Sequence, residues 1–284
     1  MNPFGGNWTA EKIDVFMKYV SAYLQIMKNQ SHFRLLYFDG FAGSGVINPD
    51  EDPDQFMQGV ATQVLSITEP REFDLYMFVE KNPDRAANLQ ALVEQYFPDK
   101  GKRVRIAEGD CNEKLLLLAA YMRSPLHRND RALAFIDPFG MQLSWDTLAA
   151  LRGIEMDAWI LVPTGIGIGR LLKNDGQIRP AWMARLQDFL GMNEEEIRGY
   201  FYREETTHTL FGAETNVVKQ ERAVERAGQL YRERIRAANI FSHVSEPLIL
   251  KNSRNSVMYH FILCSNNAVA LKIANDITRK INRR

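Results

Sequence analysis

Five short hydrophobic runs alternate with helix-like segments between residues 33 and 162, and this alternation constrains the fold more than any other feature of the chain. Strands that alternate with helices are typical of βαβ crossovers, which build a parallel sheet covered by helices on both faces. The sequence therefore predicts a doubly wound α/β fold. The predicted strands are 33–38, 74–79, 103–107, 132–136 and 158–162, and helical spacing of apolar residues marks 83–96, 112–122 and 144–151.

The segments outside this alternation predict three further parts. An amphipathic helix over 9–29 precedes the first strand, and residues 1–163 together form the α/β half. Residues 164–213 begin with spaced glycines and predict a mainly helical insertion, with helical patterns at 181–190 and 194–202. Residues 214–284 predict a long helix over 214–238, an antiparallel hairpin of strands at 247–251 and 257–264, and a closing helix over 267–280 that complete the α/β domain.

The lengths of the apolar runs and the number of cysteines indicate the cellular location of the protein. The longest uninterrupted apolar run, Leu115 to Met122, has eight residues, whereas a membrane helix needs about 20. The N-terminus shows no basic, apolar and small-residue signal pattern. Two cysteines, Cys111 and Cys264, are too few for a disulfide framework or a thiolate zinc site. We expect a cytoplasmic protein with reduced thiols and no membrane partner.

The formal net charge of zero hides an asymmetry along the chain. Residues 1–163 carry 16 basic and 22 acidic side chains, whereas residues 164–284 carry 19 basic and 13 acidic ones. One interpretation is a local basic face in the second half that contacts a polyanion. The other is an uneven distribution of solvated surface charge that has no function.

Acidic residues stand where four of the predicted strands end. These are Asp39, Glu80, Asp110 and Asp137, and a glycine-rich turn, Gly40 to Gly45, follows the first of them. In open α/β sheets ligands bind beyond the carboxyl ends of the strands. Any one acidic residue could simply cap the next helix. Four such residues beside a glycine turn favour a binding site.

The glycine turn and the acid after the second strand suit a nucleoside-containing cofactor. Without side chains in the way, backbone N–H groups at Gly43 and Gly45 can approach a carboxylate or an anion closely, and Glu80 can accept hydrogen bonds from vicinal ribose hydroxyls. A dinucleotide fingerprint is disfavoured, because a third spaced glycine is missing and Glu80 lies 35 positions after Gly45. A P-loop is excluded because no Gly-Lys-[Ser/Thr] ending is present.

The run Phe38 to Gly45 resembles the first motif of class I S-adenosylmethionine-dependent methyltransferases. More narrowly, most of residues 7–264 resembles the three-Cys-motif partner proteins, a methyltransferase-like bacterial family. This resemblance implies a Rossmann-like methyltransferase sheet, S-adenosylmethionine as cofactor, and a neighbouring three-Cys-motif protein as a partner. The segments that carry it are Asn7-Trp8-Thr9, Asp39 to Gly43, Phe135 to Gly140, Trp159 to Pro163 and Gly169 to Leu172.

The same resemblance implies a role for each residue of the cofactor site. Asp39 would lie near the ammonium group of the cofactor. Glu80 would hold the ribose hydroxyls with Lys81 alongside. Asp110 would accept from the adenine amino group, and Cys111 would offer its backbone near the ring. The methionine portion would be wrapped by Gly40, Phe41, Ala42, Gly43 and Gly45.

Asp137, Pro138 and Phe139 are the candidate catalytic residues on the acceptor side. They look like a variant of the Asp-Pro-Pro-aromatic motif of amino-group methyltransferases, in which the acid accepts from an amine and the aromatic ring stacks on a flipped base. Here Phe139 replaces the second proline, and Gly140 occupies the aromatic position. The alternative is that Asp137 and Pro138 only end a strand.

Basic and aromatic residues are interleaved after Pro163. Arg170, Trp182 and Arg185 are candidate substrate contacts that would suit a nucleic acid, although these aromatics could equally form the small core of an insertion. His208 and His243 have no partners at metal-ligand spacing, so no metal site is expected. The sequence thus indicates a methyltransferase acting on an amino group, of a nucleobase or another molecule. The alternative is a methyltransferase-like module that binds a partner protein and turns over little or not at all.

Overall fold

A computed structural model describes residues 7–47, 57–209 and 212–282. Of the acidic, proline-rich stretch 46–58, only the two ends belong to the described residues, and they form a short antiparallel pair of β2 (Val46–Ile47) and β3 (Met57–Gln58). The main sheet has five parallel strands in the spatial order β5-β4-β1-β6-β7. These five strands are β1 Arg34–Asp39, β4 Leu75–Glu80, β5 Val104–Glu108, β6 Asp130–Ile136 and β7 Met156–Val162.

Antiparallel strands from the C-terminal part extend this sheet beyond β7. The long strand β12 (Val257–Ser265) pairs with β7, and both β10 (His243–Val244) and β11 (Leu248–Lys251) pair with β12. The β11–β12 hairpin confirms the antiparallel hairpin expected from the sequence. The result is a mostly parallel, Rossmann-like α/β sheet, which confirms the predicted fold class.

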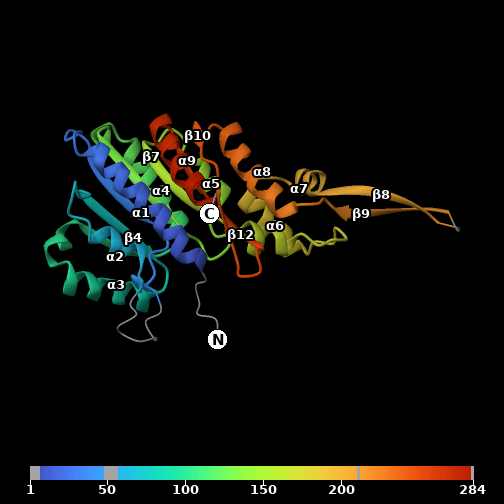
Figure 1. Ribbon diagram of the computed structural model, residues 1–284, viewed down its shortest axis with the longest axis horizontal. Coiled ribbons are helices and arrows are strands. Elements are labelled where there is room, and N and C mark those ends of the chain that lie inside the picture. Colours follow the sequence, from blue (N-terminus) through green and yellow to red (C-terminus); the bar gives the residue numbers. More distant parts are fainter. Residues whose placement is uncertain (1–6, 48–56, 210–211, 283–284) are drawn as a thin grey trace.

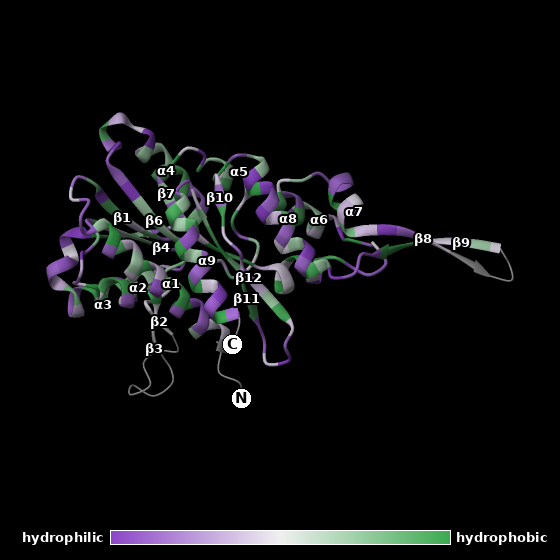
Figure 2. Ribbon diagram, turned by 45° about the horizontal axis from the view of Figure 1, so that its top comes forward, coloured by the Kyte–Doolittle hydropathy of each residue, from purple (hydrophilic) through white to green (hydrophobic). Residues whose placement is uncertain are grey.

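Helices cover both faces of the sheet, and each face has its own hydrophobic core. Along β1, Leu36 and Phe38 belong to one core and Leu35 and Tyr37 to the other, as the alternation of a strand requires. Figure 1 shows α1 and α9 side by side over one face, and Figure 2 shows hydrophobic residues concentrated in the central strands. The first core takes in α4 Cys111–Arg123, α5 Trp145–Ala149, α6 Pro180–Leu190, α7 Glu194–Phe201 and α8 Ala223–Ala237, and the second takes in α1 Asn7–Met27, α2 Val60–Leu65, α3 Pro83–Tyr96 and α9 Ala268–Asn282.

Within residues 7–47, 57–209 and 212–282, three short helical turns connect these elements: η2 Pro98–Arg103, η3 Pro125–His127 and the π-helical η4 Thr164–Gly169. The glycines of η4 allow it to pack directly on β12, because a Cβ at Gly165 would lie 1.9 Å from the carbonyl oxygen of Val257. No helix in the described part of the chain is both long enough and hydrophobic enough to cross a bilayer.

The prediction of a helix over 214–238 is wrong at its start. Strands β8 (Tyr202–Thr209) and β9 (Gly212–Lys219) form a two-stranded ribbon there, and α8 begins only at Ala223. Figure 1 shows this ribbon projecting far from the body of the molecule. Its described side chains are mostly polar and exposed, so the ribbon lacks the apolar alternation by which a half-buried strand is detected.

The chain order of the strands locates the region where a ligand can bind. From β1 the chain moves outward through β4 and β5, and it then returns to the other side of β1 as β6 and β7. The topology therefore switches direction between β1 and β6. In an open α/β sheet, the crevice at the carboxyl ends of such strands is the binding region.

Candidate functional site

A cleft of about 370 Å³ opens at the carboxyl ends of β1, β4 and β5. Six residues predicted to bind the cofactor line it: Gly40, Phe41, Glu80, Lys81, Asp110 and Cys111. Phe139, predicted on the acceptor side, lines the same cleft. The structure adds residues that the sequence did not indicate, namely Val79, Asn82, Pro83, Arg85, Gly109 and Gln142. Asp39, Ala42, Gly43 and Gly45 are not among its lining residues.

The glycine loop is held close to the sheet by its own backbone. The N–H of Gly40 donates to the carbonyl of Phe135 at 2.9 Å, and the N–H of Ala42 donates to that of Val79 at 2.9 Å. A Cβ at position 40 would lie 2.5 Å from the Sγ of Cys111, and Gly43 has a positive φ of 64°. Both conditions favour glycine, so the loop sequence follows from this close packing.

Glu80 is a carboxylate held in a fixed orientation at the cleft. Its two oxygens each accept one backbone hydrogen bond, from the N–H of Gly43 at 3.0 Å and from that of Asn82 at 2.8 Å. The side chain is 8% exposed. A carboxylate has about four acceptor positions, so Glu80 can accept further hydrogen bonds from a ligand while its own position is fixed.

Asp110 caps the start of α4 on the neighbouring strand end. It accepts from both the backbone and the side-chain amide of Asn112 at 2.9 Å, and Lys81 lies 3.3 Å away. Burial alone would raise the pKa of Asp110, but the hydrogen bonds from Asn112 and Lys81 outweigh it and hold the pKa below its ordinary value. Asp110 is therefore a charged acceptor at neutral pH.

Cys111 is buried directly behind the glycine loop. Burial, reinforced by the nearby carboxylates of Asp110 and Asp39, raises the pKa of its thiol well above the ordinary value. The thiol therefore stays protonated at neutral pH, which makes it a poor nucleophile. Its role is to pack against Gly40.

Asp39 lies beneath the loop and is 2% exposed. The N–H of Phe41 donates to it at 3.1 Å. Burial, reinforced by the negative charge of Asp137, raises its pKa to about 7, although Phe41 and Lys12 act in the opposite direction. Asp39 supports the loop from below and does not face the cleft.

The raised pKa of Asp39 predicts a pH dependence of stability. The folded protein keeps a proton that the unfolded chain releases above about pH 4, so the stabilisation is complete below that pH and is lost as pH rises to about 7. This group alone should lower the free energy of unfolding by up to about 1.4 kcal/mol per pH unit in that window. Asp39→Asn should flatten this slope in urea titrations at pH 5 and pH 8, whereas the exposed control Asp188→Asn should keep it. Equal slopes for wild type and Asp39→Asn would contradict this assignment.

Asp137 follows β6 and forms an ion pair with Lys12 of α1. Lys12 is almost fully buried, with its Nζ 5.3 Å from the centre of the Trp8 ring, and that ring lies 4.9 Å from the ring of Tyr259. Asp137 was predicted from the sequence, whereas Lys12 and Tyr259 were not. A signal for Lys12 was present, because this charged residue lies one helical turn from both Trp8 and Phe16 on an otherwise apolar face.

Phe139 lies on the rim between the cleft and Asp137, with 73% of its surface exposed. Its backbone N–H donates to the side-chain carbonyl of Gln142 at 3.1 Å, and Asn112 holds the backbone of Gln142 at 2.7 Å. An exposed aromatic ring on a supported loop is available for stacking. Pro138 is buried behind it.

The three residues predicted to contact the substrate, Arg170, Trp182 and Arg185, lie in different surroundings in the structure. Burial and the charge of Asp137 raise the pKa of Tyr259 to about 12, and Arg170 opposes them, so Tyr259 senses both charges. Trp182 is instead occupied by two cations, with Lys173 and Arg179 each 4.9 Å from its ring. No contact within the described ranges joins Trp182 or Arg185 to Asp137.

The described residues contain no cluster of three or more His, Cys, Asp or Glu side chains that could hold a metal ion.

Several solved structures are similar in fold to this chain. Neither a protein-family model nor a curated protein matches the chain. Trm1 from Pyrococcus horikoshii, solved with S-adenosyl-L-methionine, matches with a TM-score of 0.50 and 11% identity over 95% of this chain and 58% of its own. The methyltransferase domain of bacterial CtHen1 gives a TM-score of 0.36 at 10% identity over 88% of this chain and 99% of that domain. A methyltransferase from Geobacter sulfurreducens gives 0.31 at 11% identity over 78% and 92%.

The observed sheet and the likeness to Trm1 agree on the fold. The chain has the Rossmann-like fold of class I methyltransferases, and it spans 58% of the length of Trm1. At 11% identity the likeness shows the fold alone.

Proposed function

We propose that this protein is an S-adenosylmethionine-dependent methyltransferase that acts on an amino group. The observation that carries the proposal is the meeting of Glu80 and Asp110, from adjacent strand ends, with the glycine loop around one cleft. In this proposal, residues 1–163 hold the cofactor, residues 164–213 help to select the acceptor, and residues 214–284 complete the sheet.

The polar groups of the cleft match the parts of this cofactor. Glu80 has a fixed position and free acceptor capacity, which suits vicinal ribose hydroxyls. Asp110 and the backbone of Cys111 would face the adenine, and Lys81 would lie beside the ribose. The methionine portion would lie against Gly40 and its neighbours, with Asp39 supporting the loop from below.

Asp137 is the proposed acceptor-side group. When bound, the cofactor supplies a methyl group on a positively charged sulfur, and the protein must orient the amine toward it. Asp137 would accept a hydrogen bond from the amine and so direct its lone pair. Lys12 holds the carboxylate in place through a partly buried ion pair, and the exposed ring of Phe139 would stack on a flat acceptor such as a nucleobase.

The acceptor class is part of the proposal. Arg170 acts electrostatically on Tyr259, as Asp137 does, and residues 164–284 carry six more basic than acidic side chains. Both features suit a nucleic acid whose phosphates contact this half and whose base reaches Phe139. Arg185 and Trp182 would then contact the acceptor farther from the reacting amine.

A transfer assay tests the proposal. Full-length protein would be incubated with methyl-labelled S-adenosylmethionine and, separately, single-stranded DNA, single-stranded RNA, or a protein extract freed of nucleic acid. We expect label in a nucleic acid, with a yield that falls as salt rises. Label in protein alone would overturn the nucleic-acid acceptor, and no label anywhere, without cofactor binding, would overturn the proposed activity.

One observation favours a second candidate function. The ribbon β8–β9 projects from the body as a polar pair of strands, and no other strand of the described residues pairs with it. Such ribbons are suited to pairing with another chain. The alternative is therefore a methyltransferase-like module of the three-Cys-motif partner kind, which binds a neighbouring protein through this ribbon. It predicts cofactor binding without transfer in the same assay.

A further inference from the structure

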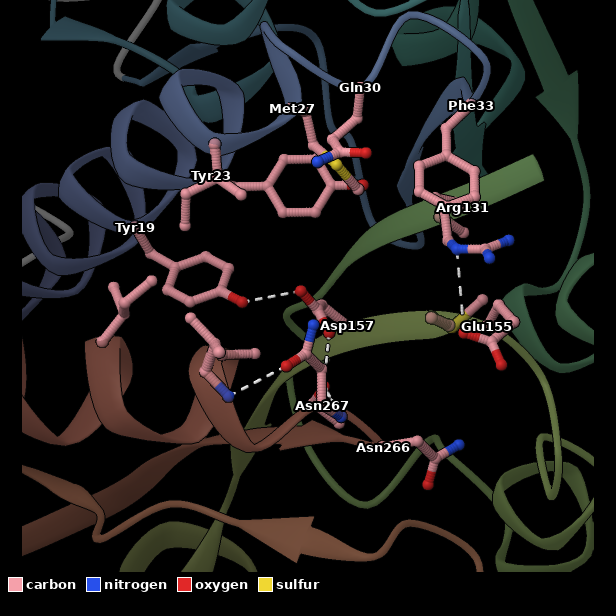
Figure 3. Close-up of a pocket in the computed structure, with 17 residues that line it drawn as sticks. Tyr19, Tyr23, Met27, Gln30, Phe33, Arg131, Glu155, Asp157, Asn266 and Asn267 are labelled. Atoms are coloured by element: carbon pink, nitrogen blue, oxygen red, sulfur yellow. Dashed lines mark hydrogen bonds and ion pairs between the residues drawn. The ribbon is translucent and has the colours of Figure 1, made fainter. Parts of the chain in front are cut away.

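A second cavity, of about 400 Å³, lies at the end of the sheet opposite to the cleft, where the parallel strands begin. It opens where β6 and β7 begin and where the antiparallel β12 ends, and α1 and α9 form its walls (Figure 3). None of its lining residues belongs to the cleft or contacts Asp137. Its chemistry therefore needs its own explanation.

The polar centre of this cavity is the carboxylate of Asp157. The hydroxyls of Tyr19 and Ser265 donate to its two oxygens at 2.7 Å and 2.5 Å, as Figure 3 shows for Tyr19. Among the described residues, no Lys, Arg or His forms an ion pair with Asp157. Arg131, at the mouth, pairs with Glu155 at 3.7 Å. The carboxylate is thus largely buried without a compensating cation.

The charge balance at Asp157 is unfavourable without a ligand. Burial, with the nearby charge of Glu155, raises the pKa of Asp157, although the hydrogen bonds from Ser265 and Tyr19 act against this rise. Burying an unpaired charge destabilises a fold, and each oxygen keeps acceptor capacity beyond its one hydroxyl donor. A positively charged donor would satisfy both conditions.

The walls of the cavity are aromatic and aliphatic. The rings of Tyr19 and Tyr23 project from α1, and that of Phe33 from the residue just before β1 (Figure 3). The hydroxyl of Tyr23 is buried without a hydrogen-bond partner, so a second polar group in the wall is unsatisfied. Aromatic faces also attract cations. Side-chain amides of Gln30 and Asn266 lie at the polar margin.

We propose that this cavity binds a small organic ammonium compound, in which a protonated amine is attached to an apolar body. The amine would pair with Asp157, and the apolar body would pack between Tyr23, Met27 and Ile273. A carboxylate ligand would be repelled by Asp157. A neutral apolar ligand would leave Asp157 uncompensated. The proposal does not depend on the reaction at the cleft.

The test compares two probes of nearly equal shape, 2-phenylethylamine and 2-phenylethanol, by calorimetric titration of the full-length protein. A charge-assisted hydrogen bond to a buried carboxylate is expected to make the amine bind about tenfold tighter than the alcohol or better. Asp157→Asn should remove that advantage and leave the alcohol unchanged. The matched control Glu155→Gln, at the mouth, should change the amine affinity less than about threefold, as expected for an exposed ion pair.

A second variant keeps the proposal testable if Asp157→Asn does not fold. Val269, more than half exposed at the edge of the cavity, can be enlarged by Val269→Trp. This change should weaken both probes by narrowing the entrance. Equal affinity for amine and alcohol, no binding of the amine at 10 mM, or full amine affinity in Asp157→Asn and Val269→Trp would each overturn the proposal.

Discussion

Glu80→Ala is expected to weaken S-adenosylmethionine binding by about 100-fold or more. Two charge-assisted hydrogen bonds to the ribose would be lost, each contributing about 1.5–3 kcal/mol. The N–H groups of Gly43 and Asn82 would also lose their common acceptor, so the glycine loop would be less well fixed. Calorimetric titration of the variant against wild-type protein measures the change.

Glu108→Ala provides a matched control for this result. Glu108 lies opposite Glu80 in the β4–β5 register and ends the neighbouring strand. It is exposed and does not line the cleft. Its removal should leave the affinity within about twofold, because an exposed acid with no ligand contact contributes little. An equal loss in both variants would mean that the general acidity of this edge, and not the position of Glu80, determines binding.

Asp137→Asn is expected to lower both stability and methyl transfer. Lys12 would be left almost fully buried without a counter-charge, and breaking a buried ion pair in this way costs about 3–5 kcal/mol. Transfer should fall about 100-fold, because the amine loses the group that orients it. Urea unfolding measures the first effect, and single-turnover transfer at saturating cofactor measures the second.

The double variant Lys12→Met with Asp137→Asn separates the two roles of the pair. Replacing the lysine by an apolar side chain of similar length removes the unpaired charge, so most of the lost stability should return. Methyl transfer should stay low, since the carboxylate is still absent. Recovery of transfer together with stability would show that Asp137 has only a structural role.

Much of the sheet could be predicted from the sequence because buried parallel strands consist of continuous runs of apolar residues. The run before Asp39 and the run before Asp137 became adjacent strands β1 and β6. The same logic brought Glu80 and Asp110 to one cleft, since the carboxyl ends of parallel strands share an edge. Local pattern and topology were sufficient for these residues.

The sequence could not provide contacts that depend on packing between distant elements. The pair of Lys12 and Asp137 joins residues 125 positions apart, and no local pattern states which strand end α1 will cover. Asp157 gave no signal either, because its surroundings come from α1, β7 and β12. The ribbon of β8 and β9 was missed because exposed strands need no apolar face.

A crystal structure of the full-length protein with S-adenosylhomocysteine tests the central claim most directly. The account predicts the adenosyl group in the cleft at the carboxyl ends of β1, β4 and β5, with its ribose hydroxyls within hydrogen-bond distance of Glu80 and its adenine beside Asp110. The sulfur should face the side where Asp137 and Phe139 lie. An adenosyl group bound elsewhere, such as in the cavity around Asp157, or a ribose without contact to Glu80, would contradict it.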